Sequence, residues 1–277
     1  MQLQTAEAVW ARIELLAHKN PGGVVATDGD GTLWQGDVGE DLFFAFLDHG
    51  RVELPARDAI RRDALEHGLS DAGTGVDVAR RIYAAYIDGL FPEERLCELM
   101  TWCFAGWRRS EVAAFAREVV DGERLRNRLH GEVLRVLERV RAAGIETVLV
   151  SASPVAVVRE AGSHVGFDED HVVAAHPGYD GHVIMPRVDR PIPYAAGKVT
   201  RLRERIGRER VLYAAFGDNA FDVAMLSSAC ISVAVRPKQR LRERAAAVPE
   251  LVELVPEGGE AEVRADSRGK GGRADGI

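Results

Sequence analysis

A short apolar run that ends in two closely spaced aspartates constrains the fold of this chain more than any other feature. Residues 24–27, Val-Val-Ala-Thr, lead directly into Asp28-Gly29-Asp30-Gly31-Thr32. An uninterrupted run with β-branched residues is typical of a strand that is buried on both faces of a parallel sheet. If the strand geometry continues, Asp28 and Asp30 extend from the same face, because side chains alternate with a period of two.

Two carboxylates at this spacing repel each other unless a cation compensates them. Mg²⁺ prefers oxygen ligands of this kind. The pair then suits phosphoryl chemistry, in which one carboxylate attacks phosphorus and the other moves a proton. The alternative is an acidic Asp-Gly turn without a ligand, since such turns are common.

The composition is that of an ordinary globular chain. Of its 277 residues 46% are hydrophobic and 29% are charged, which suits one large domain or two smaller ones. The net charge of −7 at pH 7 disfavours nucleic acid as the main partner. No apolar run is long enough to span a bilayer, and the first residues do not form a signal peptide. We therefore expect no membrane partner and a cytoplasmic location, with reduced core cysteines at Cys97, Cys103 and Cys230.

Helical patterns without a convincing strand fill the segment from Leu42 to about Leu129. Turn signals separate its helical stretches at residues 54–55, 71–73, 89–92 and 121–122. We interpret the segment as an inserted helical subdomain. The predicted parts are a core of residues 1–35 and 130–256, a helical cap of residues 36–129, and a disordered tail of residues 257–277.

Strand and helix patterns alternate in the rest of the chain. A helix over residues 4–18 precedes the first strand. The sequence then predicts strands at residues 145–150, 172–175, 183–185, 211–216 and 231–235, and helices at residues 132–143, 155–165, 196–206 and 238–247. This alternation predicts an α/β fold with a parallel sheet and right-handed crossovers. Sheets of this kind bind ligands at the carboxyl ends of their strands.

Polar side chains that suit phosphoryl chemistry fall at these strand ends and at one helix start. Asp218 would give Mg²⁺ a third oxygen ligand beside Asp28 and the backbone carbonyl of Asp30. The full set is Asp28, Asp30, Ser151, Lys198, Asp218 and Asp222.

The other members of this set would bind the phosphoryl group. Ser151 Oγ and the neighbouring backbone N–H groups could hold its oxygens at a helix N-terminus. Lys198 could neutralise charge on the group in transfer, and Asp222 could orient Lys198. Each residue has a plainer interpretation, since Ser151 could be an N-cap and Lys198 a solvated surface residue. Their order along the chain favours the phosphoryl site.

Four segments together resemble the motifs of the haloacid dehalogenase (HAD) superfamily. They are Asp28-Gly29-Asp30-Gly31-Thr32, Ser151, Lys198, and Gly217-Asp218 through Asp222. The closer resemblance is to the phosphoserine-phosphatase-like subfamily IB. It is carried by Val150-Ser151-Ala152-Ser153-Pro154, Gly197-Lys198-Val199 and Gly217 through Leu226. The similarity covers residues 23 to about 250 and implies a Rossmann-like three-layer core with an inserted cap.

The resemblance implies a role for each residue of the site. Asp28 would be the nucleophile that becomes an aspartyl phosphate, and Asp30 would protonate the leaving oxygen and then activate water. A carboxylate at the position of Asp30 is typical of phosphoryl-transfer members and disfavours dehalogenation. The implied phosphate-binding residues are Thr32, Ser151, Ala152 and Lys198, the metal ligands are Asp28, Asp30 and Asp218, and Asp222 supports them.

Asp37 stands where phosphoserine phosphatases carry an acidic residue that contacts the substrate amino group, so the resemblance makes it a substrate-binding residue. Here the residue is Asp rather than Glu, and Phe221 replaces the usual asparagine. Both differences argue against phosphoserine itself. With Glu40 and Asp41 nearby, the hypothesis is that the substrate carries a cationic group. A helix start whose acidic residues suit the helix dipole explains the same pattern.

The sequence therefore predicts a Mg²⁺-dependent phosphatase that acts on a small phosphorylated metabolite. A phosphotransferase that passes the aspartyl phosphate to another acceptor needs the same motifs and is the first alternative. The second is a non-catalytic protein that binds a phosphorylated ligand and uses cap closure for signalling. Such a protein does not need a proton-transfer residue at Asp30, which disfavours this alternative.

Overall fold

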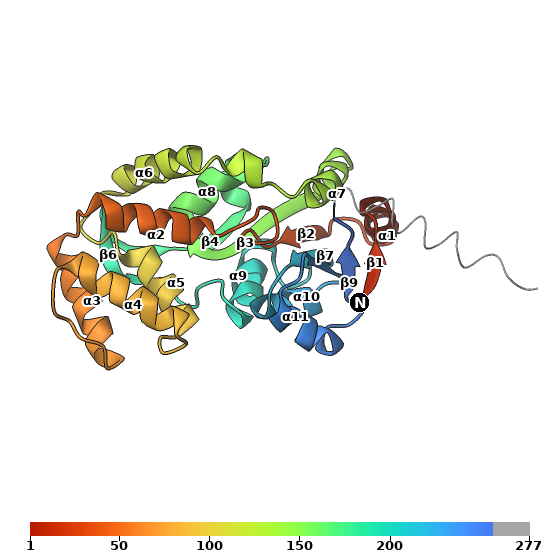
Figure 1. The fold of residues 1–277 in the computed structure, drawn as a ribbon. Coiled ribbons are helices and arrows are strands. Elements are labelled where there is room, and N and C mark those ends of the chain that lie inside the picture. The colour runs from red at the N-terminus through yellow and green to blue at the C-terminus, as the bar shows by residue number, and fades with distance from the viewer. Residues whose placement is uncertain (257–277) are drawn as a thin grey trace, which may run out of the picture. The chain divides into compact units, whose positions relative to one another are not determined.

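The computed structural model describes residues 1–256, which form two compact units (Figure 1). The first unit contains Met1–Gln35, Leu129–Thr147 and the described residues from Glu209 onward. The second unit contains Gly36–Arg128 and Val148–Arg208. The predicted disordered tail lies outside the described residues, and the predicted core and cap boundaries stay predictions.

Five parallel strands form the centre of the first unit. In their order across the sheet they are β1 (Gln2–Gln4), β9 (Val252–Leu254), β8 (Ile231–Val235), β7 (Leu212–Gly217) and β2 (Val24–Thr27). β2, β7 and β8 are buried along their whole length, as their apolar runs predict. Thr27 pairs with Phe216 in the register. The residues that follow β2 and β7 therefore leave the sheet at the same edge.

Helices cover both sides of these strands. In Figure 1, α7 (Gly131–Ala142) lies on one side, and α10 (Val223–Ser227) and α11 (Gln239–Arg244) lie on the other. α1 (Ala6–Lys19) packs against α7 and β7, while α10 packs against β7 and β8. Two short 3₁₀ helices, Ala220–Asp222 and Ala245–Ala247, connect these elements. The predicted α/β fold is confirmed.

The second unit combines helices with two pairs of strands. Its α-helices are α2 (Val38–His49), α3 (Leu54–Glu66), α4 (Gly75–Ile87), α5 (Glu93–Trp102), α6 (Arg109–Gly122), α8 (Val155–Ser163) and α9 (Ala196–Ile206), and its 3₁₀ helices are Leu125–Arg128 and Glu169–His171. β3 (Glu146–Pro154) pairs in parallel with β4 (Val172–Ala175). β5 (Pro177–Asp180) and β6 (Val183–Val188) form an antiparallel hairpin. α6 runs along α8 (Figure 1).

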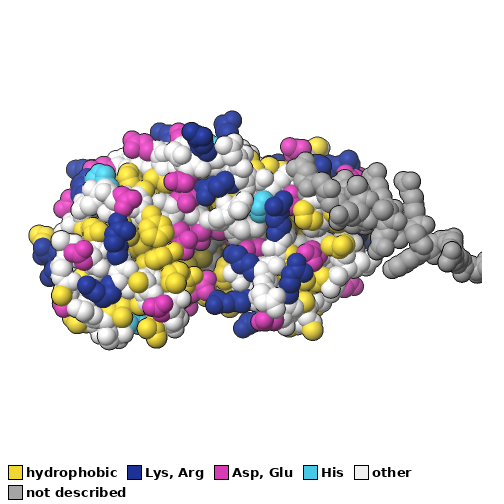
Figure 2. Space-filling view, in the orientation of Figure 1, with side chains coloured by type: hydrophobic (Ala, Val, Ile, Leu, Met, Phe, Trp, Pro, Cys, Tyr) yellow, Lys and Arg dark blue, Asp and Glu magenta, His cyan; other side chains and the backbone are white. Residues whose placement is uncertain are grey.

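Aromatic side chains fill much of the interior of the second unit. Phe46 of α2 lies with its ring centre 4.8 Å from that of Phe104. Phe104 in turn contacts Trp107 edge-on at 5.4 Å. All three are buried, so these pairs add packing energy to the area that they remove from water. Figure 2 shows basic and acidic side chains interspersed on one face of the molecule, as is usual for a solvated surface.

The structure corrects several local predictions. Residues 54–55 are not a turn between helices but the beginning of α3, where Pro55 occupies the first turn and has no N–H to leave unpaired. The sequence did not predict β1 and β9, which have three residues each. Cys103 is buried as predicted, but Cys230 is exposed, because it lies in the turn between α10 and β8. Among residues 1–256, no helix has the length and apolar character needed to cross a membrane.

Candidate active site

The loop after β2 holds Asp28 in a fixed orientation. Asp28 is buried, and its backbone N–H donates to the carbonyl of Phe216 across the sheet (3.0 Å). Thr32 Oγ1 donates a hydrogen bond to Asp28 Oδ2 (3.0 Å). The N–H groups of Thr32 and Leu33 both bond to the carbonyl of Gly29, which closes the loop into a tight turn. One carboxylate oxygen is therefore held by Thr32, and the carboxylate cannot rotate without losing that bond.

Asp30 and the end of the loop have partners of their own. Trp34 Nε1 donates to Asp30 Oδ1 (2.9 Å), and Trp34 is fully buried. His130, at the start of α7, places Nδ1 3.0 Å from the carbonyl of Thr32. Burial lowers the pKa of His130, and its hydrogen bond to Thr32 partly offsets this shift. Neutral His130 can donate from Nδ1, so it braces the loop without adding charge beside the aspartates.

Gly31 is required where the loop passes Asp218. Its φ is +79°, a conformation that residues with a side chain rarely adopt. A Cβ at this position would lie 2.1 Å from Asp218 Oδ2. The glycine therefore lets the carboxylate after β7 approach the backbone of the loop after β2.

Three buried carboxylates come together at this edge of the sheet. Asp28, Asp218 and Asp222 each offer an oxygen, and these oxygens all lie within 4.8 Å of one another. Asp222 Oδ2 accepts hydrogen bonds from the N–H groups of Asp218 (3.0 Å) and Asn219 (2.9 Å), so it fixes the turn after β7. A set of oxygen donors with this concentration of negative charge fits a divalent cation such as Mg²⁺. Asp28 and Asp218 are the better suited ligands, because Asp222 already holds the backbone.

A lysine that the sequence did not single out also contacts this cluster. Lys238 Nζ lies 2.9 Å from Asp218 Oδ2, and the Lys238 N–H donates to the carbonyl of Asp218 (2.8 Å). Lys238 directly precedes α11, three residues after β8 ends at Val235. Ligands bind at the carboxyl ends of the strands in such sheets, and Lys238 follows the end of β8. Its position in the sequence could therefore have identified it as a candidate site residue.

The predicted residues Ser151, Ala152, Lys198 and Asp37 belong to the second unit. Ser151, in β3, is buried, and its Oγ accepts a hydrogen bond from the N–H of Ser153 (3.0 Å). α8 begins at Val155 with Pro154 as its N-cap, so Ser151 is not the N-cap of that helix. Ala152 follows on β3 and is half-buried.

Lys198 is fully buried, which rules out the interpretation as a solvated surface residue. It lies in the first turn of α9, after Ala195 with a φ of +47°. A Cβ on Gly197 would lie 2.0 Å from the carbonyl oxygen of Ile192, so only glycine fits before this lysine. A buried ammonium is costly unless anions or hydrogen-bond acceptors surround it. The predicted contact of Lys198 with the phosphoryl group stays a prediction.

Asp37 and its acidic neighbours have structural roles. Asp37 is the N-cap of α2, and its Oδ1 accepts from the N–H of Glu40 (2.9 Å). Glu40 accepts a hydrogen bond from Tyr83 Oη (2.9 Å), and Asp41 pairs with Arg128 (2.5 Å). These contacts agree with the interpretation as a helix start whose acids suit the helix dipole. The predicted contact of Asp37 with substrate stays a prediction.

The chain is similar to one known family and to several solved structures. A family model described as haloacid dehalogenase-like hydrolase matches residues 25–227. A solved structure of a protein of unknown function from Bordetella pertussis Tohama I has a TM-score of 0.62 at 22% identity, with 83% of this chain and 97% of that chain covered. A HAD family hydrolase from Salmonella enterica subsp. enterica serovar Typhi has a TM-score of 0.51 at 17% identity, with coverage of 85% and 73%.

A third solved structure extends the likeness. A phosphoserine phosphohydrolase-like protein from Francisella tularensis subsp. tularensis SCHU S4 has a TM-score of 0.50 at 12% identity, and 83% of this chain and 94% of that chain are covered. No curated protein matches the chain. At these identities the solved structures show the fold, and the family model spans well over half of the sequence. The chain therefore belongs to the haloacid dehalogenase-like hydrolases.

Proposed function

We propose that this hydrolase is a Mg²⁺-dependent phosphatase that cleaves a small phosphomonoester through an aspartyl phosphate on Asp28. The observation that carries the proposal is the group of buried carboxylates where β2 and β7 end, with Asp28 oriented by Thr32. Carboxylates this close in a buried site repel one another, and a divalent cation would balance their charge. The family of the chain supports a hydrolase.

In the first step, the Asp28 oxygen that does not bond to Thr32 attacks phosphorus. The bond between phosphorus and the ester oxygen breaks, and Asp30 gives its proton to that leaving oxygen. Ser151, the backbone of Ala152 and Lys198 bind the phosphoryl oxygens and reduce the repulsion between them and Asp28. Trp34 keeps Asp30 oriented through the bond to Oδ1.

In the second step, Asp30, now a carboxylate, takes a proton from water. The water oxygen attacks phosphorus, the bond to Asp28 breaks, and inorganic phosphate leaves. Mg²⁺, held by Asp28, Asp218 and the backbone carbonyl of Asp30, would offset negative charge on the carboxylates and the phosphoryl group. Asp222 supports this arrangement by holding the turn that carries Asp218.

The proposed architecture is a core of residues 1–35 and 130–256 and a cap of residues 36–129 that excludes water during transfer. The substrate is a small phosphorylated metabolite. The hypothesis for Asp37 is that it contacts a cationic group of this substrate. The proposed location is the cytoplasm. A phosphotransferase would use the same first step and replace water with another acceptor.

The test is phosphate release from a panel of phosphomonoesters, with and without Mg²⁺, by the wild type, Asp28→Asn and Asp48→Asn. Asp48 is a matched control, because it is an exposed aspartate that pairs with Arg80 on the surface (2.6 Å). The panel pairs aminoalkyl phosphates with neutral esters of the same length. We expect Mg²⁺-dependent release by the wild type and Asp48→Asn, and loss by at least about 1,000-fold in Asp28→Asn.

Three results would change the account. Activity that survives in Asp28→Asn would refute the assignment of the nucleophile. Consumption of the ester without release of phosphate would favour the phosphotransferase. Equal turnover of cationic and neutral esters, with Asp37→Ala behaving like the wild type, would refute the cationic-group hypothesis alone.

A further inference from the structure

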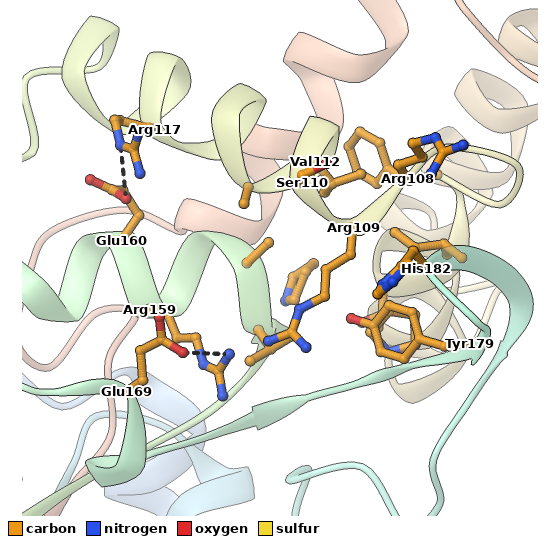
Figure 3. Close-up of a pocket in the computed structure, with 18 of the residues that line it drawn as sticks. Arg108, Arg109, Ser110, Val112, Arg117, Arg159, Glu160, Glu169, Tyr179 and His182 are labelled. Atoms are coloured by element: carbon orange, nitrogen blue, oxygen red, sulfur yellow. Dashed lines mark ion pairs between the residues drawn. The ribbon is translucent and has the colours of Figure 1, made fainter.

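A cavity of about 750 Å³ lies within the second unit, between α6, α8 and the β5–β6 hairpin (Figure 3). Its size falls in the range of sites for small organic ligands, about 300–1,000 Å³. Its described lining residues include none of the predicted catalytic, phosphate-binding or metal-binding residues. The cavity is therefore a separate candidate site, and its chemistry does not depend on the proposed phosphatase function.

One wall of the cavity is apolar. Phe104, Val112, Val155 and Ile184 line it, and each is buried in the fold and so held in place. The hairpin contributes Tyr179, whose ring lies beside the cavity in Figure 3. Fixed apolar side chains of this kind can cover the hydrocarbon part of a ligand.

Two of the described arginines of the lining are paired with lining carboxylates, and Arg109 is not. Four arginines line the cavity, against three carboxylates. Arg159 pairs with Glu169 (2.9 Å) and Arg117 with Glu160 (3.5 Å), as Figure 3 shows. Arg109 makes no ion pair with any described residue, and its guanidinium extends into the cavity. Arg108 points away from it in the same view.

Arg109 also lies close to the aromatic ring of the hairpin. The Arg109 guanidinium carbon lies 5.9 Å from the centre of the Tyr179 ring.

We propose that this cavity binds an organic monocarboxylate. Its carboxylate pairs with Arg109, and its hydrocarbon part lies on Phe104, Val112 and Ile184. Arginine suits this head group, because the planar guanidinium bonds to both carboxylate oxygens. The single unpaired guanidinium of Arg109 matches a monoanion better than a phosphate dianion.

The test is calorimetric titration of the full chain with phenylbutyrate, its neutral analogue phenylbutanamide, and inorganic phosphate. Arg109→Gln removes the unpaired charge. Arg117→Gln is the matched control, because it lies on the same helix and its charge is already paired with Glu160. Both arginines are exposed, so neither substitution disturbs the core.

We expect phenylbutyrate to bind the wild type and phenylbutanamide to bind at least about tenfold more weakly. Arg109→Gln should weaken the binding of phenylbutyrate by at least about tenfold, and Arg117→Gln should weaken it by less than about twofold. Phosphate release should be unchanged in Arg109→Gln, which separates this site from the catalytic one.

Several results would overturn the proposal. They are no binding of phenylbutyrate up to about 10 mM, equal binding of the acid and the amide, or equal effects of the two substitutions. An effect of Arg109→Gln on inorganic phosphate rather than on phenylbutyrate would also overturn it, since the cavity would then select phosphate. A failure of the phosphatase panel would not bear on any of these outcomes.

Discussion

Gly31→Ala tests directly how the loop after β2 and the turn after β7 form one site. The new Cβ would lie 2.1 Å from Asp218 Oδ2 and 2.7 Å from Asp218 Cγ. Gly22, in the turn before β2, has a similar φ of +88°, and a Cβ added there would meet no described atom within 4 Å. Gly22→Ala therefore carries the same backbone penalty without the contact.

The expected magnitude has two parts. The positive φ costs alanine about 1–2 kcal/mol at either position. At Gly31 the ordinary contact distance of 3.4 Å or more requires Asp218, which also pairs with Lys238, to move by over 1 Å. We expect this crowding to remove a further 1–3 kcal/mol, roughly, of unfolding free energy. A displacement of about 1 Å at a catalytic carboxylate lowers the rate by about 100-fold.

The assay is urea unfolding of both variants together with kcat and KM for nitrophenyl phosphate at saturating Mg²⁺. Gly22→Ala should lose about 1–2 kcal/mol of stability and keep its kcat. Gly31→Ala should lose more stability and about 100-fold in kcat. Equal stability losses with equal kcat would refute the reasoning, because the contact with Asp218 would then have no consequence.

Three further predictions concern single interactions. Trp34→Phe removes the donor to Asp30, and kcat should fall by about tenfold with little change in KM, measured beside the unfolding free energy. Arg95→Ala removes the arginine partner of the buried Asp63 carboxylate and leaves it, among the described residues, only His67, at 3.9 Å; urea unfolding should show a loss of about 3–5 kcal/mol, and a loss below about 1 kcal/mol would contradict this. Because burial lowers the pKa of His130 in the folded state, protons favour unfolding: its contribution to stability is complete above its usual pKa of 6.5 and is lost as the pH falls. The melting temperature of His130→Gln should therefore fall less than that of the wild type between about pH 7 and 5.

The positions of the main elements could be predicted because their patterns are long and local. β2 and β7 are uninterrupted apolar runs, and the helix predicted at residues 196–206 is observed as α9 with those bounds. β1 and β9 could not be predicted in this way. Three residues are too few to show a period, and the two strands pair with each other from opposite ends of the described chain.

Only part of the candidate site could be predicted from the sequence. Asp28, Asp30 and Asp218 follow strands, so they could be predicted as site residues from the topology of a parallel sheet. The bonds from Trp34 to Asp30 and from Lys238 to Asp218 depend on how loops fold over the strand ends. The spacing of residues does not encode the direction of such side chains. For the same reason the sequence did not reveal that Asp222 holds the backbone of Asp218 and Asn219.

The central claim is that Asp28 is the nucleophile. The most direct measurement is to trap the intermediate with hydroxylamine during turnover of a phosphomonoester and to locate the modified residue by peptide mass spectrometry. An acyl phosphate reacts with hydroxylamine to give a hydroxamate on the aspartate that carried it. We expect a hydroxamate on Asp28 that requires both substrate and Mg²⁺. A hydroxamate on another residue, or turnover that leaves every aspartate unmodified, would contradict it.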